Sequence, residues 1–347
     1  MRETPQVCLM NKQETLGERE IIEIIQKQLD RKSKMPIPFG DDVAACDLGG
    51  GHLAVLKTDM LIGKTDVPKT MSLWQAARKA VVMNISDFAA KGVKPQALLV
   101  SLGLSRGLHK KDIEEIGEGL NAGAREYDTY IIGGDTGEAS DLIINISVFG
   151  TAKRADIMLR SGAKPGDVVA VTGPFGKAAA GLKILIEDLQ APKDVRKNLV
   201  ESALMPRARL KEGLALGTSK TVTAAIDSSD GLAWSLHEVA KASNVGFIID
   251  KLPIAEEAEE FAKSNKLDLA ELTLYGGEEY ELVLSVKQKG WQKAKQAVAD
   301  FGCELMPIGK VTKGRNIVLS DNGKTCTIEP KGYEHFMTDV RISKTNT

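Results

Sequence analysis

Residues 222–243 read VTAAIDSSDGLAWSLHEVAKAS and join two patterns of secondary structure. The first six residues form an apolar, β-prone run, which predicts a strand over Val222–Asp227. Apolar residues at helical spacing follow, and they predict a helix over Gly231–Ser243. The turn between the two elements, DSSD at 227–230, places two carboxylates directly after the strand.

The rest of the chain alternates strands and helices in the same way. Such interleaving favours an α/β fold with α+β layers over a helical bundle or a β-sandwich. A punctuated stretch begins at Arg154 (RADIMLRSGAKPGD), so we expect two domains, residues 1–153 and 154–347. The first fifteen residues and those after Phe336 are expected to be loose. The expected elements include helices at Leu16–Arg31, Leu73–Lys91 and Lys111–Tyr127, and strands at His52–Thr58, Ala97–Gly103, Tyr130–Ile132, Leu142–Gly150, Val168–Thr172, Gly246–Asp250, Tyr280–Val286 and Asn316–Ser320.

Composition excludes several classes of protein. The chain has 347 residues, 46 Lys plus Arg and 47 Asp plus Glu, so its net charge is −1 and no basic excess indicates nucleic-acid binding. No apolar run reaches the length of about 18 that spans a membrane, and residues 1–14 lack the apolar stretch of a secretion signal. Four scattered cysteines, Cys8 among them, argue against structural zinc or a disulfide framework. We therefore expect a cytoplasmic protein.

Acidic residues recur at the ends of expected strands or the starts of helices, beside glycine or another small residue. One such residue alone is most simply a turn or N-cap residue, but six such sites are harder to dismiss. Gathered carboxylates repel one another unless cations lie between them, and hard oxygen ligands suit Mg²⁺. The pattern predicts phosphoryl transfer or ATP-driven activation through several Mg²⁺ ions. The six sites are Asp41-Asp42, Thr58-Asp59, Asp87, Asp135, Asp227 with Asp230, and Glu278.

Other motifs are absent. Gly63-Lys64-Thr65 ends like a P-loop, but Thr58 stands where the leading glycine is needed. No G-x-G-x-x-G motif opens a strand–helix unit, and no G-x-S-x-G motif presents a nucleophilic serine. The four histidines are scattered, and His237 is most simply a structural or surface residue.

The ordered motifs of the chain carry a resemblance over nearly its whole length, from about Gly17 to Phe336. The chain resembles the thiamine-monophosphate kinase family of the aminoimidazole ribonucleotide synthetase superfamily. The matching motifs are GDD at 40–42, TDML at 58–61, NISDFAAKG at 84–92, GGDT at 133–136, RSGAKPGD at 160–167, DSSDGL at 227–232, GGEEYEL at 276–282 and GYEHF at 332–336.

The resemblance implies a fold and an activity. A PurM-like N-terminal domain would bind ATP and Mg²⁺ and form a homodimer, and a PurM-like C-terminal domain would complete the nucleotide and substrate cleft. The activity would be ATP-dependent phosphorylation of thiamine monophosphate to thiamine diphosphate, a kinase reaction of thiamine diphosphate biosynthesis with no nucleic-acid or membrane partner. The alternatives are another ATP-dependent synthetase of the superfamily and a relative that binds ATP without turnover.

The resemblance also implies roles for individual residues, by position in each motif. The predicted roles are catalysis by Asp59, Asp87 and Asp230; metal binding by Asp41, Thr58, Asp59, Asp87, Asp135, Asp227 and Asp230; ATP binding by Gly134, Asp135, Arg160 and Ser229; and thiamine-side contact by Asp66, Glu278 and Tyr333.

Three positions depart from the family pattern. Lys57 stands where Thr or Ser usually precedes the Thr-Asp pair. Residues 63–66 read GKTD where a G-V-H-F run is usual, so Asp66 would contact the substrate without the histidine that this run usually provides. Gly117 falls where an aromatic residue commonly lies, so adenine would stack elsewhere.

Overall fold

The structure, a computed structural model, describes residues 16–30, 34–321 and 323–336. The chain forms two compact units, one of residues 34–332 and one that takes in residues 1–33 and 333–347. The loose segments expected at residues 1–15, which include Cys8, and after Phe336 lie outside the described residues. Among the helices of these described ranges, none combines the length and the hydropathy that a membrane span requires.

The smaller unit contains helix α1 (Glu18–Gln28). The amide of Glu18 donates to the carbonyl of His335 at 3.3 Å, and the amide of His335 donates to the Glu18 carboxylate at 3.3 Å. These hydrogen bonds hold residues 333–336 to the first turn of α1. The helix expected over Leu16–Arg31 is confirmed over a shorter range.

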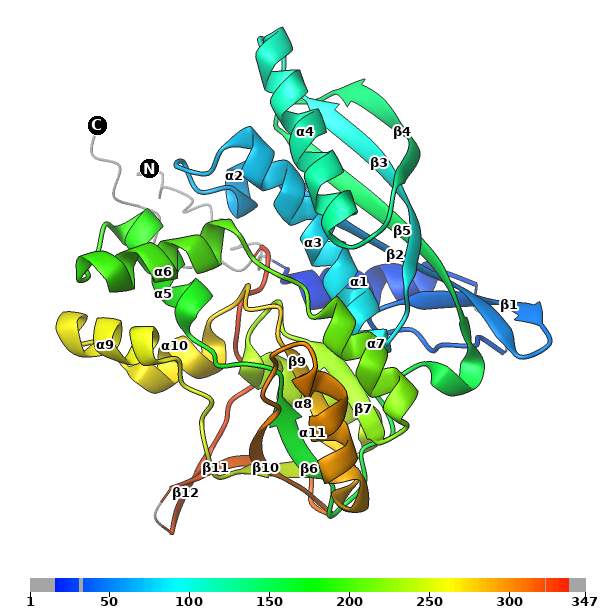
Figure 1. Ribbon diagram of the computed structural model, residues 1–347, viewed down its shortest axis with the longest axis vertical. Coiled ribbons are helices and arrows are strands. Elements are labelled where there is room, and N and C mark those ends of the chain that lie inside the picture. The colour runs from blue at the N-terminus through cyan, green and yellow to red at the C-terminus, as the bar shows by residue number, and fades with distance from the viewer. Residues whose placement is uncertain (1–15, 31–33, 322, 337–347) are drawn as a thin grey trace, which may run out of the picture. The chain divides into compact units, whose positions relative to one another are not determined.

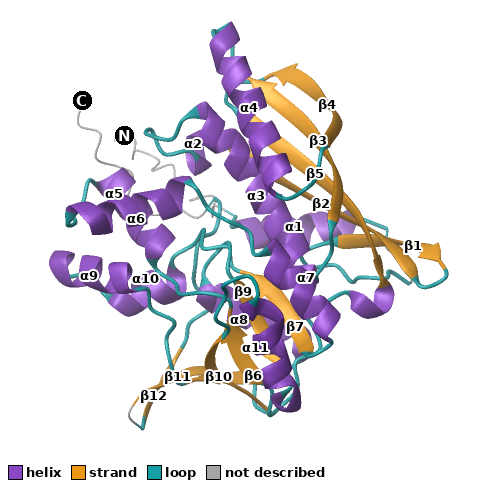
Figure 2. Ribbon diagram, viewed as in Figure 1, coloured by secondary structure: helices purple, strands orange, loops and turns teal. Residues whose placement is uncertain are grey.

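The larger unit contains a five-stranded sheet in the order β1-β2-β5-β3-β4. Strands β3 and β4 are parallel, and the other neighbouring pairs are antiparallel. Helices α3 and α4 cover one face of this sheet (Figure 1, Figure 2). The bounds are β1 Ala44–Gly49, β2 His52–Ile62, α2 Gly63–Asp66, α3 Leu73–Lys91, β3 Pro95–Leu104, α4 Lys110–Glu126, β4 Ile131–Glu138 and β5 Ile143–Lys153.

Helix α3 has clear start and stop signals. Ser72 Oγ accepts from the amide of Gln75 at 3.1 Å, and Gln75 Oε1 accepts from the amide of Ser72 at 2.9 Å, which forms a capping box. The helix ends at Gly92, whose φ of +65° is in the left-handed region that glycine adopts without strain. Nearly all of α3 is buried, because neighbouring helices approach it closely. A Cβ at Gly119 of α4 would lie 2.2 Å from the carbonyl oxygen of Trp74.

The larger unit also contains a seven-stranded sheet in the order β12-β11-β8-β10-β6-β9-β7. Only β8 and β11 pair in parallel in this sheet, as far as the described residues show. The bounds are β6 Val168–Val171, α5 Lys177–Glu187, α6 Lys193–Leu204, α7 Leu210–Ser219, β7 Val222–Asp227, α8 Leu232–Ser243, β8 Gly246–Ile249, α9 Glu256–Asn265, α10 Leu269–Tyr275, β9 Leu282–Val286, α11 Trp291–Ala299, β10 Met306–Thr312, β11 Ile317–Asp321 and β12 Lys324–Thr327.

Helix α3 contributes to a hydrophobic cluster that includes residues of both sheets. The cluster joins Phe88 of α3 with Val148 of the first sheet and with Ala225 and Leu284 of the second. Helix α7 also lies against α3, and a Cβ at Gly213 would be 2.0 Å from the carbonyl oxygen of Ala89. This packing brings the middle of α3 beside the end of β7.

The mixed sheets and their helices confirm the expected α/β class with α+β layers. The expected bounds Leu73–Lys91 and Val222–Asp227 are those of α3 and β7. Strand β4 runs through Gly133-Gly134-Asp135, which the sequence pattern placed after a strand. The domain division between residues 153 and 154 stays a prediction.

Candidate active site

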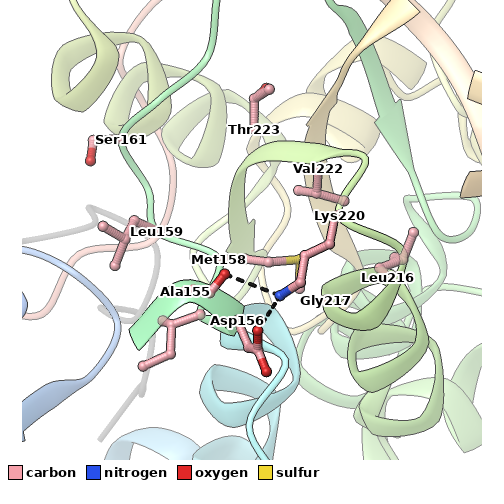
Figure 3. Close-up of a pocket in the computed structure, with 11 residues that line it drawn as sticks. Ala155, Asp156, Met158, Leu159, Ser161, Leu216, Gly217, Lys220, Val222 and Thr223 are labelled. Atoms are coloured by element: carbon pink, nitrogen blue, oxygen red, sulfur yellow. Dashed lines mark hydrogen bonds and ion pairs between the residues drawn. The ribbon is translucent and has the colours of Figure 1, made fainter. Parts of the chain in front are cut away.

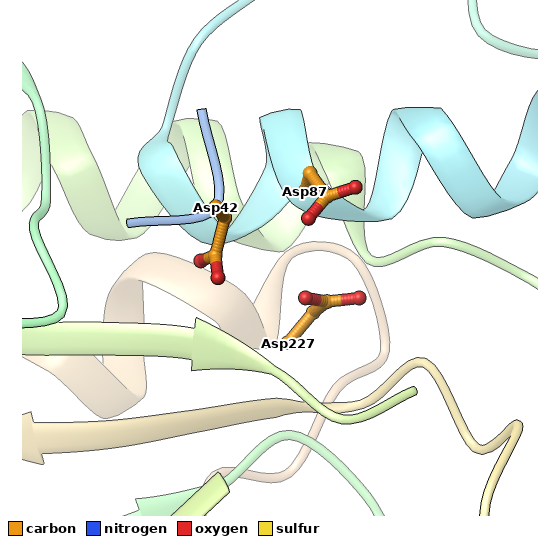
Figure 4. Close-up of side chains that lie close together, drawn as sticks. All are labelled: Asp42, Asp87 and Asp227. Atoms are coloured by element: carbon orange, nitrogen blue, oxygen red, sulfur yellow. The ribbon is translucent and has the colours of Figure 1, made fainter. Parts of the chain in front are cut away.

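Three carboxylates from distant parts of the sequence meet where α3 packs on the second sheet (Figure 4). Asp42 lies in the loop before β1, Asp87 lies on α3, and Asp227 ends β7. One carboxylate oxygen from each lies within 4.8 Å of the others, and all three residues are buried. Ser86 Oγ donates to Asp227 Oδ2 at 2.7 Å. We call Asp42, Asp87 and Asp227 the acidic cluster.

Cationic side chains flank the acidic cluster on two sides. Lys91 Nζ lies 2.7 Å from Asp41 Oδ1 and 2.7 Å from Asp42 Oδ2. Arg160 Nε donates to Asp42 Oδ1 at 2.5 Å. On the other side, Lys57 Nζ lies 2.9 Å from Asp87 Oδ2. The buried negative charge is therefore partly compensated by the protein itself.

The three carboxyl groups differ in how readily they ionise. Burial opposes ionisation of Asp42, but Lys91 and Arg160 together lower its pKa. Burial raises the pKa of Asp87 well above its usual range, with Lys57 opposing the rise and Asp227 adding to it. Burial also raises the pKa of Asp227 to about 6; the Asp42 carboxylate adds to the rise, and the hydrogen bond from Ser86 opposes it. A bound cation would relieve this crowding, and oxygen donors of this kind fit Mg²⁺.

Two buried polar atoms next to the acidic cluster have no protein partner among the described residues. Asn84 Oδ1 lies on α3, one turn before Asp87, and Ser228 Oγ directly follows Asp227. A buried polar atom without a partner costs free energy, so such atoms mark places where a ligand, an ion or water completes the structure. Both support a binding site here.

The strand that carries Asp59 divides the predicted metal ligands between two faces of the first sheet. Lys57 and Asp59 point toward α3, where Lys57 Nζ lies 3.9 Å from Asp59 Oδ2. Thr58 points to the opposite face, because side chains alternate along a strand, and its Oγ1 donates to Asn145 Oδ1 at 3.1 Å. Asp135 pairs in register with Ser101, on the same face as Thr58. Within one chain, Thr58 and Asp135 do not join the acidic cluster.

A second group of residues lies around the ammonium of Lys79, which is fully buried on α3. Lys79 Nζ donates to the carbonyl of Asp66 at 3.0 Å and forms an ion pair with Glu278. The Asp66 carboxylate is used locally, because Asp66 Oδ2 accepts from the amide of Ile62 at 2.7 Å. Two predicted thiamine-side residues are thus brought together through Lys79.

The loop that presents Glu278 is strained and tied to the DSSD turn. Glu278 has a φ of +66° and Tyr280 a φ of +54°, which are uncommon for residues other than glycine. The amide of Glu278 donates to the carbonyl of Ser229 at 2.6 Å, and that of Tyr280 to Ser228 at 2.9 Å. Backbone strain of this kind clusters at ligand sites.

The other predicted site residues lie as follows. The Arg160 amide donates to Asp41 Oδ2 at 3.0 Å, so Arg160 and Asp41 border the acidic cluster. Gly134 has a structural reason to be glycine, since a Cβ there would lie 1.9 Å from the carbonyl oxygen of Val100. Ser229 is exposed and Asp230 half-buried in the same turn. Tyr333 belongs to the smaller unit, where its ring meets His335 edge-on at 5.0 Å.

Several residues of the site were not assigned a role from the sequence. The motif GDD offered both Asp41 and Asp42, and the prediction chose Asp41. Lys79 and Lys91 are charged residues of a mostly apolar helix, and nothing in the sequence shows that their side chains are buried. Lys57 had one signal, its place directly before the Thr-Asp pair.

A separate pocket of about 150 Å³ lies between the segment 155–161 and α7 (Figure 3). Lys220 Nζ at its edge donates to the carbonyl of Ala155 at 3.0 Å and pairs with Asp156. Its lining includes none of the predicted site residues. The acidic cluster is therefore the better candidate for the active site.

Comparison with known proteins assigns both halves of the chain. Residues 40–152 match the N-terminal domain of AIR synthase related protein, and residues 164–322 match its C-terminal domain. The thiamine-monophosphate kinase of Nitrosopumilus maritimus (strain SCM1) is 35% identical over 321 residues, which cover 92% of this chain and 99% of that protein. The thiamine-monophosphate kinase of Pyrococcus abyssi (strain GE5 / Orsay) is 36% identical over 330 residues, which cover 94% and 98%.

A solved structure agrees with this assignment. AaThiL complexed with AMPPCP and TMP matches with a TM-score of 0.80 and 27% identity, and the match covers 92% of this chain and 97% of that one. The family resemblance expected from the ordered motifs is confirmed. This chain belongs to the thiamine-monophosphate kinase family of AIR synthase related proteins.

Proposed function

We propose that this protein transfers the γ-phosphoryl group of ATP to thiamine monophosphate and so forms thiamine diphosphate. The observation that carries the proposal is the buried acidic cluster close to a strained loop, in a chain whose relatives over nearly full length are thiamine-monophosphate kinases. A related structure contains AMPPCP, an ATP analogue, together with TMP. The comparisons do not favour another synthetase of the superfamily.

We also propose that divalent cations bind at the acidic cluster. Asp42, Asp87 and Asp227 would hold a cation, with Asp59 and Asp41 at its border. When bound, Mg²⁺ would offset the repulsion between the phosphates of two anionic substrates. Crowded carboxylates and the unpartnered atoms beside them support this role.

The transfer would be direct and in line. A phosphate monoester is ionised above a second pKa of about 6, so the acceptor oxygen needs no general base. The acidic cluster contains no histidine among the described residues. The ring of His237 is bound to the Ile328 carbonyl, with Nε2 at 2.8 Å. The chain would contribute positioning and electrostatic stabilisation rather than proton transfer.

The remaining site roles are part of the same proposal. Asp230 would act near the acceptor, Gly134, Asp135, Arg160 and Ser229 would contact ATP, and Glu278, Asp66 and Tyr333 would contact the thiamine moiety. The link through Lys79 supports a common location for Asp66 and Glu278. The domain division at residue 153 and a cytoplasmic location, where ATP is available, belong to the proposal as well.

We propose a homodimer that forms through the open face of the first sheet. Leu56, Leu99 and Phe149 are exposed on this face, where Leu56 and Phe149 are register partners. A second copy would cover these apolar side chains and would approach Thr58 and Asp135, which lie on the same face. We propose no nucleic-acid or membrane partner.

The test of the activity is identification of the product. Purified protein is incubated with ATP, Mg²⁺ and thiamine monophosphate, and mass spectrometry follows thiamine diphosphate and ADP. Thiamine and aminoimidazole-type acceptors are tested in parallel as the alternative substrates. Thiamine diphosphate formed in step with ADP supports the proposal, whereas ATP turnover with another acceptor alone, or no turnover, overturns it.

A further inference from the structure

Lys57 places an ammonium group inside the proposed metal site. Its Nζ lies 2.9 Å from Asp87 Oδ2 and 3.9 Å from Asp59 Oδ2. The side chain is only 20% exposed and comes from the middle of β2, so the strand fixes its direction. Because Lys57 lies in a strand and not in a loop, its backbone position is fixed, and its ammonium stays beside Asp59 and Asp87.

Lys57 is also the cation on which this side of the site depends. Lys91 and Arg160 form their ion pairs with Asp41 and Asp42. In the described part of the chain, no other Lys or Arg lies within ion-pair distance of Asp59, Asp87 or Asp227. Removing a single partner from buried charges leaves them uncompensated, which is strongly destabilising.

We propose that the Lys57 ammonium occupies a cation position of this site, so that the chain binds one divalent cation fewer around Asp59 and Asp87 than it would with a neutral residue at position 57. The inference rests on the proposed function only in taking divalent cations as ligands of the acidic cluster. An ammonium is a compact point charge that carboxylates bind through hydrogen bonds. Because it is tethered, it remains when the metal concentration falls, and the cluster stays folded without metal.

The test counts cations in the absence of nucleotide. Mn²⁺ is titrated into metal-stripped wild-type protein and into Lys57→Met, Lys57→Arg and Lys64→Met variants, and free Mn²⁺ is followed by electron paramagnetic resonance. Met has a similar length to Lys but no charge, Arg keeps the charge, and Lys64 is exposed nearby as a matched control. We expect Lys57→Met to bind one more Mn²⁺ per chain than the wild type. The Kd of this additional ion should be at least about tenfold lower than the Kd with which the wild type binds any Mn²⁺ beyond its own count. The other two variants should match the wild type.

The second measurement is thermal unfolding with and without Mg²⁺. In EDTA, Lys57→Met should unfold about 5–10 °C below the wild type, and Mg²⁺ should restore most of the loss. If Lys57→Met is unfolded in EDTA, it is prepared in Mn²⁺ and its bound metal is counted after dialysis. An unchanged Mn²⁺ count, or a loss of Tm that Mg²⁺ does not reverse, overturns the proposal and leaves Lys57 as a structural ion-pair partner. Because no nucleotide is present, these results are independent of the product assay.

Discussion

Asp87 is buried between Lys57 and Asp227, at the centre of the candidate site. We predict that Asp87→Asn lowers the rate of thiamine diphosphate formation by about 10²–10³-fold, the usual cost of one lost electrostatic contact in an active site. The metal-free Tm should change by no more than about 3 °C, because the variant also relieves carboxylate repulsion.

The measurement for this prediction is ADP release together with thermal unfolding in EDTA. Asp47→Asn is the matched control, since Asp47 is an exposed acid that pairs with Arg154 at 2.8 Å, outside the site. Full activity of Asp87→Asn at ordinary Mg²⁺ concentrations would sink the assignment of the acidic cluster.

Glu279, which has no role in the proposed site, predicts a pH dependence of the stability of the protein. Its Oε1 accepts from the amides of Gly176 at 2.7 Å and Ala178 at 3.1 Å, at the start of α5, and burial raises its pKa to about 8. The folded protein therefore binds a proton that the unfolded chain, with a pKa of 4.5, releases. Stability should fall as pH rises from about 4.5 to 8.

Glu279→Gln keeps the hydrogen-bond acceptor but cannot ionise. The stability of this variant should therefore decrease less between pH 5 and pH 8 than the stability of the wild type. Urea midpoints at pH 5 and pH 8 measure the difference for the wild type and the variant. Asp42 acts in the opposite direction, but only at lower pH, because its pKa is lowered. Equal slopes for the two proteins would contradict the prediction.

Some candidate site residues stand at recognisable ends of elements, and others are identified only through the family resemblance. Asp227 ends an expected strand. Asp87 lies inside the helix Leu73–Lys91, so its predicted role depends on its place in the motif NISDFAAKG. Asp41 and Asp42 lie in a turn without periodicity, and nothing in the sequence shows which carboxylate points to Asp87. Likewise, Thr58 and Asp59 point in opposite directions because side chains alternate along a strand, but which of the two faces α3 becomes known only once the helix packs on the sheet.

At the level of elements, the contact of α3 and α7 is tightest at Gly213. A Cβ at Gly213 would lie 2.0 Å from the carbonyl oxygen of Ala89, which is backbone and cannot turn away. We predict that Gly213→Ala destabilises the protein by about 1–3 kcal/mol, as overpacking usually does.

Urea unfolding measures this effect, with Gly117→Ala as the control. Gly117 is also helical, but it is exposed, and a Cβ added there would have no atom within 4 Å. Gly117→Ala should be neutral or stabilising by up to about 1 kcal/mol. Equal destabilisation of the two variants would contradict the prediction that the close approach of α7 to Ala89 requires a glycine at position 213.

Elements with caps and periodic patterns were predictable, and those shaped by tertiary contacts were not. Strand β10 contains Pro307 and Gly309, which argue against a strand in the sequence alone. The structure explains Gly309, because a Cβ there would lie 2.1 Å from the carbonyl oxygen of Ile248 on the neighbouring strand. Gly133 and Gly134 of β4 likewise suggest a turn in the sequence alone, because glycine is unfavourable inside a strand. In the structure, Gly134 packs against the backbone of β3.

At the scale of the whole molecule, the open face of the first sheet predicts self-association. We expect a homodimer at micromolar concentration, because Leu56, Leu99 and Phe149 form an exposed apolar group. Leu99→Glu should give a folded monomer, since a charge would be buried at the interface. Ile186→Glu, at an exposed residue of α5, should remain dimeric. Light scattering after size-exclusion chromatography measures the mass, and a monomeric wild type would contradict the prediction.

The burial of α3 has a consequence for how the protein melts. Phe88 and its apolar neighbours are covered by residues of both sheets, so neither half can lose its structure without uncovering the same helix. The two matched domains should therefore unfold together as one cooperative unit, with one free energy of unfolding, and not as two independent units. We expect calorimetry of the metal-free protein to show a single transition for residues 34–332, and two separated peaks would mean that α3 keeps its structure with one sheet alone. A substitution on α3 should accordingly lower the melting temperature of the whole unit, including strands that it never touches.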